Sequence, residues 1–247
     1  MSSPIRYPTH YPMNPLQKGA IAILSGLGAL LRPQRGDLVA TMGETTGEFL
    51  LPYLKSRMSN NPEGRLILME KPRVTDEILR KAAAMPAGTF GAAYAEFMSS
   101  RGFLPADRPP VRFVDDPDSA YVMTRIREVH DFWHVLFNCH TNVFGEIALK
   151  AVEFRQTGLP MTGLAALGAQ YKLKPEDRKI MQDVFMPWAA RAGGACRDLV
   201  GIYYEKHLDR ELDDVRREWK IHPAPEAPVQ LKRHQNANKE RLGGGGN

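Results

Sequence analysis

The chain has 247 residues, of which 43% are hydrophobic and 25% charged, and its formal net charge is +5. These values are ordinary for a globular protein and allow one domain with a substantial buried core. The basic residues are spread along the chain, without a zinc-finger spacing or an aromatic-interleaved basic stripe, so we expect no nucleic acid as a partner. Cys139 and Cys196 form no Cys-x-x-Cys motif and are expected to be free thiols of an intracellular protein.

The longest apolar stretch, residues 20–31, is interrupted by glycines and ends before Pro33. It is shorter than the roughly 20 residues that a membrane-spanning helix needs. The residues before it have the pattern of neither a secretory signal nor a transit peptide. Two interpretations stay open: a buried core helix, and a helix that enters a membrane interface or helps to hold a lipid tail.

Proline, glycine and capping residues divide the rest of the chain into short helical segments. We expect an all-α fold: one domain of roughly eight helices over residues 1–221, followed by a flexible polar tail over residues 222–247. Turns are predicted at 60–64 and at Lys71-Pro72, and a loop at 101–117, with 111–114 as the only strand candidate. The predicted helical segments are 15–31, 37–43, 47–58, 76–85, 89–100, one from the acidic segment 115–119 to Phe137, 143–156, 161–171, 175–192 and 194–220.

The helix that ends at Phe137 has the clearest pattern. It is apolar over much of its circumference, so we expect it to be buried together with its histidines. One stripe along it consists of Val122, Ile126, Val129, Trp133 and Leu136, and the adjacent stripe of Met123, Arg127, His130, His134 and Phe137.

His130 and His134 lie one turn apart on one face of this helix, a spacing that lets two imidazoles share a metal ion. Asp131 lies about 100° round the helix, where it could bind the metal or hold a water beside it. Glu146 follows His134 by 12 residues, about 18 Å along a straight helix. The break at 138–142 allows the next helix to bring Glu146 back, with Gly145 permitting close backbone approach.

A hydrogen-bonded pair of core histidines is the alternative to a metal site. Buried carboxylates require a cation, which favours the metal, and imidazole with carboxylate ligands suits Zn, Mn, Fe or Co. Asp131 differs from the Glu that zinc proteases use in His-Glu-x-x-His. A His-Asp phosphohydrolase would need an upstream histidine, and only His10 is present.

The segment HDFWHVLFNCHTNVFGE resembles the His-Asp-x-x-His-x11-Glu motif of a ubiquinone (coenzyme Q) biosynthesis family, the fourth of the Coq proteins. Further landmarks of that family occur in the same order between about Tyr7 and His222. They are YPTHYPMNPLQK, GETTGEFLL, RFVDDPDSAYV, RIREVHD, FGEIALKAVEFRQTGLPM, PWA and IYYEKH.

The resemblance implies an all-α fold and a divalent metal, most simply Zn²⁺, held by His130, Asp131, His134 and Glu146 between two adjacent helices. It implies a peripheral protein on the matrix face of the mitochondrial inner membrane, in a complex with other ubiquinone-biosynthesis enzymes. It also implies C1 decarboxylation of 4-hydroxy-3-methoxy-5-polyprenylbenzoate. The oligomeric state is open, and a homodimer is one of the states considered.

Loss of CO2 from such a substrate requires a proton at C1. Asp131 is the first candidate for the catalytic acid, with His140 as the second. Arg127 and Lys150, each about one turn from a predicted ligand, are candidates to bind the anionic substrate, and ordinary ion pairs are the alternative for both. An oxidative version of the reaction, which needs O2 and a redox-active metal, stays open. The rival function is a non-catalytic, lipid-binding scaffold with a structural metal.

Overall fold

A computed structural model of the chain describes residues 4–31 and 35–226, and within these ranges the regular structure is helical. An isolated bridge between Thr89 and Glu211 is the only β-type pairing there. The α-helices are α1 (Pro15–Leu31), α2 (Gly36–Gly47), α3 (Leu51–Ser59), α4 (Pro62–Glu70), α5 (Asp76–Ala83), α6 (Phe90–Ser99), α7 (Pro117–Phe137), α8 (Val143–Thr157), α9 (Pro160–Gly168), α10 (Pro175–Ile180), α11 (Met186–Ala195) and α12 (Leu212–Glu218). The all-α prediction is confirmed.

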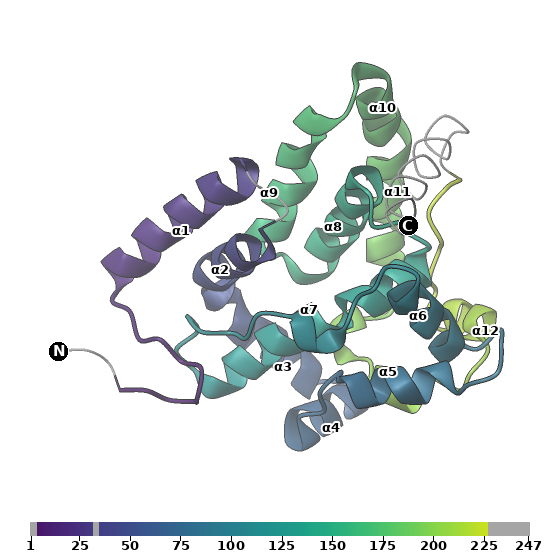
Figure 1. Cartoon of the computed structure of the whole chain (residues 1–247), viewed down its shortest axis with the longest axis horizontal. Coiled ribbons are helices and arrows are strands. Elements are labelled where there is room, and N and C mark those ends of the chain that lie inside the picture. Colours follow the sequence, from purple (N-terminus) through teal and green to yellow (C-terminus); the bar gives the residue numbers. More distant parts are fainter. Residues whose placement is uncertain (1–3, 32–34, 227–247) are drawn as a thin grey trace, which may run out of the picture.

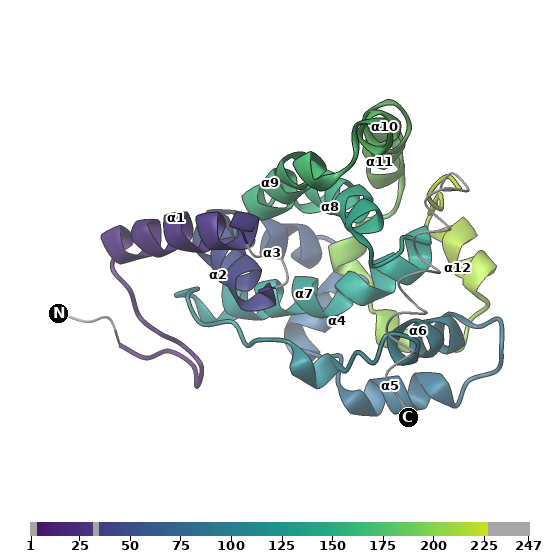
Figure 2. The same ribbon diagram turned by 45° about the horizontal axis from the view of Figure 1, so that its top comes forward.

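Helix α7 is the central element of the fold (Figure 1). It packs against α3, α6 and α8, while α9 and α11 pack against α8. Helix α1 lies at the edge of the molecule on α2, as both views show (Figure 2). Among the described residues, none of the helices combines the length and hydropathy needed to cross a bilayer.

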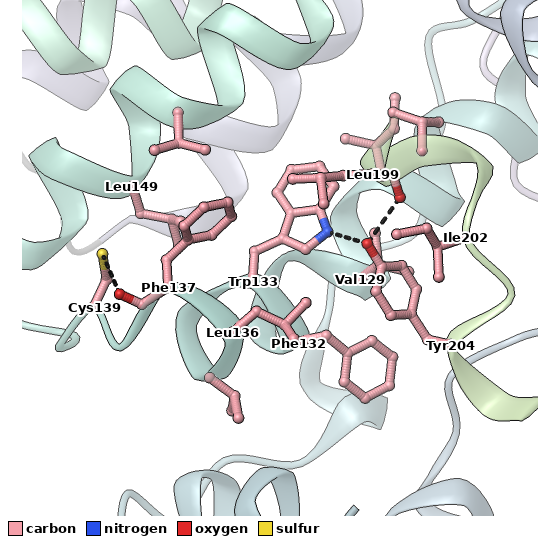
Figure 3. Packing of buried hydrophobic residues seen from close by; sticks show 14 of the residues in the cluster. Val129, Phe132, Trp133, Leu136, Phe137, Cys139, Leu149, Leu199, Ile202 and Tyr204 are labelled. Carbon is pink, nitrogen blue, oxygen red and sulfur yellow. Dashed lines mark hydrogen bonds between the residues drawn. The ribbon is translucent and has the colours of Figure 1, made fainter. Parts of the chain in front are cut away.

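The core follows the apolar stripe predicted for α7. Val129, Trp133 and Leu136 are almost completely buried, and Figure 3 shows them between α8 and the segment around Tyr204. The indole N–H of Trp133 donates to the Tyr204 hydroxyl at 2.8 Å, and that hydroxyl donates to the Leu199 carbonyl at 2.8 Å (Figure 3). The indole ring of Trp133 can be buried without a large desolvation cost because its N–H has a hydrogen-bond partner.

Two predictions about local structure were wrong. Residues 60–64 do not form only a turn, because Asn61 caps α4 by accepting from the Glu63 N–H, and Pro62 occupies the first helical turn. The Asn-Pro pair therefore starts a helix, since proline at this position loses no hydrogen bond. The strand candidate at 111–114 forms no strand. Its backbone instead bonds to side chains, including the Glu44 carboxylate, which accepts from the N–H of Arg112 and Phe113.

The predicted helix over 194–220 was also wrong for most of its length. Two short 3-10 turns, Leu199–Gly201 and Tyr204–Lys206, precede α12. Hydrogen bonds and an ion pair with residues distant in sequence, instead of helical backbone hydrogen bonds, fix the conformation of this segment. The buried Arg125 guanidinium of α7 contacts both oxygens of Glu205, and its Nη2 lies 3.4 Å from the Ile202 carbonyl oxygen. A partner distant in sequence thus overrides local helix propensity.

The predicted helix over 175–192 is continuous but irregular. A π-helical turn, Met181–Phe185, joins α10 to α11. Pro187 is the second residue after this turn. Because proline has no N–H, the regular series of i to i−4 hydrogen bonds is interrupted there. The C-terminal tail predicted for 222–247 falls largely outside the described residues, of which 222–226 lack regular structure.

The Arg125–Glu205 pair provides a test of this arrangement. Arg125 is fully buried, so Glu205→Gln leaves a buried cation without a counter-ion. We expect the free energy of unfolding, measured by urea titration, to fall by about 3 to 5 kcal/mol. The exposed pair Lys179–Asp183 is the control, and Asp183→Asn should cost less than about 1 kcal/mol. Equal effects of the two substitutions would contradict a structural role for the buried pair.

Candidate metal centre

The turn between α7 and α8 brings three of the four predicted ligands together. Asn138 ends α7 in the left-handed region, at φ 52° and ψ 40°, a conformation that asparagine tolerates better than most residues. Asn142 then caps α8, its side-chain oxygen accepting from the Gly145 N–H at 2.8 Å. Helix α8 therefore packs against α7 and brings Glu146 beside the two histidines, as the break in the pattern predicted.

Gly145 is required for close approach of two backbone segments. The segment that it approaches is the turn at His140, not the backbone of the preceding helix as predicted. A Cβ at this position would lie 2.1 Å from the carbonyl oxygen of His140, within the turn itself. Any larger side chain would displace the turn that sets the position of Glu146.

His130, His134 and Glu146 form the one group of three or more His, Cys, Asp or Glu residues in the described part of the chain whose potential ligand atoms lie within 4.8 Å of one another. The two Nε2 atoms are 3.1 Å apart. Glu146 Oε1 is 3.2 Å from Nε2 of His134, and its Oε2 is 3.8 Å from Nε2 of His130. The imidazole of His134 is almost completely buried, whereas the Glu146 side chain is 38% exposed. The group therefore opens to solvent on the side of Glu146.

Hydrogen bonds at the other ring nitrogens orient both imidazoles. Nδ1 of His134 lies 2.9 Å from the Cys139 carbonyl oxygen, and Nδ1 of His130 lies 2.9 Å from a Glu153 oxygen. Both of these partners are acceptors, so both Nδ1 atoms carry the proton. In the neutral rings the Nε2 lone pairs then point at each other and at Glu146.

Electrostatics at the group are consistent with ionised carboxylates. Burial raises the pKa of Glu146, but the two imidazoles outweigh burial and hold it well below its usual value. Burial also opposes ionisation of Glu153, yet Lys150 and His130 lower its pKa to about 2. For His130, burial and Lys150 lower the pKa, and the two carboxylates reverse this and raise it overall.

The donor set fits a divalent ion. Two nitrogens at about 2.0 to 2.1 Å from a tetrahedral zinc ion would be separated by roughly 3.3 Å, close to the observed 3.1 Å. Without a metal ion, a proton on one Nε2 would have to separate the two lone pairs and the carboxylate. Three protein ligands would leave one tetrahedral position for water or a substrate, as in catalytic zinc sites.

Asp131 is not part of the three-residue group. Its Oδ2 accepts from the guanidinium of Arg108, and its side chain is nearly buried. As a fourth ligand and as the catalytic acid, Asp131 therefore stays a prediction. Arg108 also lines a cavity of about 660 Å³ between the N-terminal segment and α7, so Asp131 contacts a residue of the cavity wall.

The two predicted substrate-binding residues have protein partners. Arg127 donates to Glu44 at 3.0 Å and to the Pro109 carbonyl at 2.7 Å, and it also lines the cavity. Lys150 forms an ion pair with Glu153. Contact of either residue with substrate stays a prediction, and the ion pairs considered as the alternative are present.

Sequence analysis missed the groups that support the ligands. Glu153 follows Glu146 by seven residues, or two turns of α8, and this spacing could have revealed a second carboxylate on the face towards α7. The Cys139 carbonyl and Arg108 had no comparable signal, because a backbone orientation and a loop residue 23 positions before Asp131 depend on the fold.

Comparisons with known proteins agree with the resemblance found in the motif. The profile of the family described as "Coenzyme Q (ubiquinone) biosynthesis protein Coq4" matches residues 7–225. The chain belongs to the Coq4 family. A relative from Uncinocarpus reesii, named "Ubiquinone biosynthesis protein COQ4, mitochondrial", is 43% identical over 223 residues, which cover 89% of this chain and 80% of the relative. One of the same name from Laccaria bicolor is 43% identical, covering 90% of this chain and 75% of the relative.

The fold has a counterpart among solved structures. The crystal structure of a Nostoc punctiforme protein, named "Putative ubiquinone biosynthesis protein", superposes with a TM-score of 0.65 at 22% identity. The match covers 81% of this chain and 97% of the Nostoc chain. At this identity the likeness concerns the fold alone, and it supports the all-α architecture of this Coq4 family member.

The convergence of three ligands predicts metal binding that depends on each of them. Purified protein should hold about one divalent ion per chain, measured by elemental analysis after gel filtration. Glu146→Ala should remove one ligand of three and release the ion, as should His134→Ala. The control is Asp183→Asn, which removes an exposed carboxylate elsewhere in the fold and should leave the metal content unchanged. Full metal content in Glu146→Ala would contradict the role of α8 in the site.

Proposed function

We propose that this Coq4 family member is a metal-dependent lyase that removes the C1 carboxyl group of 4-hydroxy-3-methoxy-5-polyprenylbenzoate in ubiquinone biosynthesis. The observation that carries the proposal is the convergence of His130, His134 and Glu146, with the carboxylate partly open to solvent. A structural metal needs four protein ligands and a closed site. Three convergent ligands favour catalysis over the rival scaffold role.

A bound divalent ion would supply Lewis-acid stabilisation of negative charge on the substrate. The two imidazoles hold their Nε2 atoms towards one point, because Glu153 and the Cys139 carbonyl fix the opposite nitrogens. We assign Asp131 to proton delivery. Arg108 binds its Oδ2 and leaves Oδ1 for exchange of a proton. Asp131 would take up a proton from water at Oδ1 and deliver it to C1; the C1–carboxyl bond then breaks, and the bond electrons return to the ring as CO2 leaves.

The oxidative variant places a hydroxyl group at C1 instead of hydrogen, and O2 must then accept electrons. The two variants differ in product, so mass spectrometry after turnover of a short-prenyl analogue distinguishes them. Turnover by either route should stop when a chelator removes the metal and resume when the metal is restored. Metal-independent turnover would contradict the proposal.

The site of action that we propose is the matrix face of the mitochondrial inner membrane, within a complex of ubiquinone-biosynthesis enzymes. Two observations support it: the relatives are named mitochondrial, and α1 exposes a row of large apolar side chains. That row follows one face of the helix, while Gly26 and Gly28 face Met42 and Leu38 of α2. Its members are Leu16, Ile23, Leu24, Leu27 and Leu31, each more than half exposed.

An exposed apolar helix face predicts membrane binding. Burial of one leucine side chain contributes about 1.5 to 3 kcal/mol, so Leu24→Glu should weaken binding to cardiolipin-containing vesicles by at least about tenfold in a flotation assay. Tyr53→Glu, at an exposed site on α3, is the control. Unchanged binding by Leu24→Glu would exclude α1 as the membrane contact. Loss of self-association without any change in vesicle binding would assign the face to a second copy of the chain.

The substitution Asp131→Asn distinguishes a catalytic role of the protein from a scaffold role. The substitution keeps the size of the side chain but removes its ionisable group, so decarboxylation should fall by about 100- to 10,000-fold, the usual contribution of general acid–base catalysis. The measurement is ubiquinone content in cells that lack the native protein and stably express the variant. Asp118→Asn, in the first turn of the same helix, should leave ubiquinone content near normal. Near-normal ubiquinone content with Asp131→Asn would favour the scaffold.

A further inference from the structure

The two imidazoles of the candidate metal centre are supported by different groups. His134 donates from Nδ1 to a neutral acceptor, the backbone carbonyl of Cys139. His130 donates from Nδ1 to a carboxylate, Glu153, at 2.9 Å. Nothing in the sequence motif distinguishes the two histidines in this way, because Glu153 lies outside the His-Asp-x-x-His-x11-Glu segment.

Glu153 lies where a carboxylate is costly unless it has a function or a partner. Its side chain is only 4% exposed, and both of its oxygens are engaged, one by His130 and the other by the ammonium group of Lys150. Lys150 is itself largely buried, at 17% exposure of its side chain. The lysine supplies the counter-charge that a buried carboxylate requires.

Helix α8 thus contacts both nitrogens of one ring. Glu146 lies 3.8 Å from Nε2 of His130, and Glu153, two turns later, lies 2.9 Å from Nδ1. A carboxylate at Nδ1 fixes the ring orientation, keeps the proton on Nδ1 and makes Nε2 a stronger electron donor. The backbone carbonyl of Cys139 likewise fixes the orientation of the His134 ring and keeps the proton on its Nδ1, but it carries no net charge.

We propose that Glu153, held by Lys150, is the positioning residue of the metal centre: it orients His130 and makes it the more strongly donating of the two imidazole ligands. This inference rests on the proposed metal site but assigns a role to residues outside the ligand set. It also gives Lys150 a role distinct from the predicted contact with substrate.

The test is the affinity of the full-length protein for Zn²⁺, measured by competition with a chromophoric chelator. Glu153→Ala should weaken binding about 10- to 100-fold, the usual effect of removing an outer-sphere partner. Glu153→Gln keeps an oxygen that can accept from Nδ1 but removes the charge, so its loss should be smaller. Glu128→Ala is the matched control, because Glu128 is a buried carboxylate paired with Arg73 and has no contact with either imidazole.

A second readout distinguishes positioning from a general loss of stability. In the Co²⁺-substituted protein, Glu153→Ala should change the visible ligand-field spectrum, whereas Glu128→Ala should leave it unchanged. If Glu153→Ala does not fold, the comparison is made with Glu153→Gln and Lys150→Met, and both should weaken binding and alter the spectrum.

Zinc affinity within twofold of wild type in the Glu153 variants, or weaker binding with an unchanged Co²⁺ spectrum, would overturn the positioning role alone. Absence of zinc binding by the wild-type protein would overturn both this inference and the proposed function. The two failures are therefore distinguishable.

Discussion

Two lone pairs and a carboxylate directed at one point repel one another unless a positive charge lies between them. Such an arrangement is present where α7 and α8 pack together, with the two Nε2 atoms 3.1 Å apart and Glu146 beside them. The surrounding structure maintains this otherwise unfavourable geometry through the buried stripe of α7, the left-handed Asn138 and the Asn142 cap. A binding site that keeps its ligands oriented before the metal arrives needs less reorganisation when it binds.

Side chains on different faces of α7 lie in two different chemical environments. On one side of α7, the imidazoles and the α8 carboxylates form the candidate metal centre. Around the helix, Asp131 turns towards Arg108 and a cavity that Arg127 also lines. Adjacent residues in the sequence thus serve different neighbours, because successive side chains of a helix diverge by about 100°. A substrate that reached both environments would lie against the metal ligands and the proposed proton donor together.

Much of the fold could be predicted from the sequence. The apolar stripe of α7, the break after Phe137 and the return of Glu146 follow from helical periodicity and from the turn residues between the helices. Two of the failures share one cause. The segments 111–114 and 194–220 are shaped by contacts with residues distant in sequence, such as Glu44 with the 112–113 backbone and Arg125 with Glu205. Local propensity carries no information about those contacts. The failure at 60–64 was local, because Asn61 and Pro62 start a helix there.

The sequence by itself determined which residues could bind a metal, since His130, His134 and Glu146 have the spacing and chemistry of ligands wherever the two helices meet. It also carried the landmarks of the Coq4 family. Only the tertiary structure decided that Asp131 turns to Arg108, that Lys150 pairs with Glu153, and that Glu153 supports His130. The physical reason is that a side chain's partner depends on the rotation and packing of whole helices, which periodicity leaves undetermined.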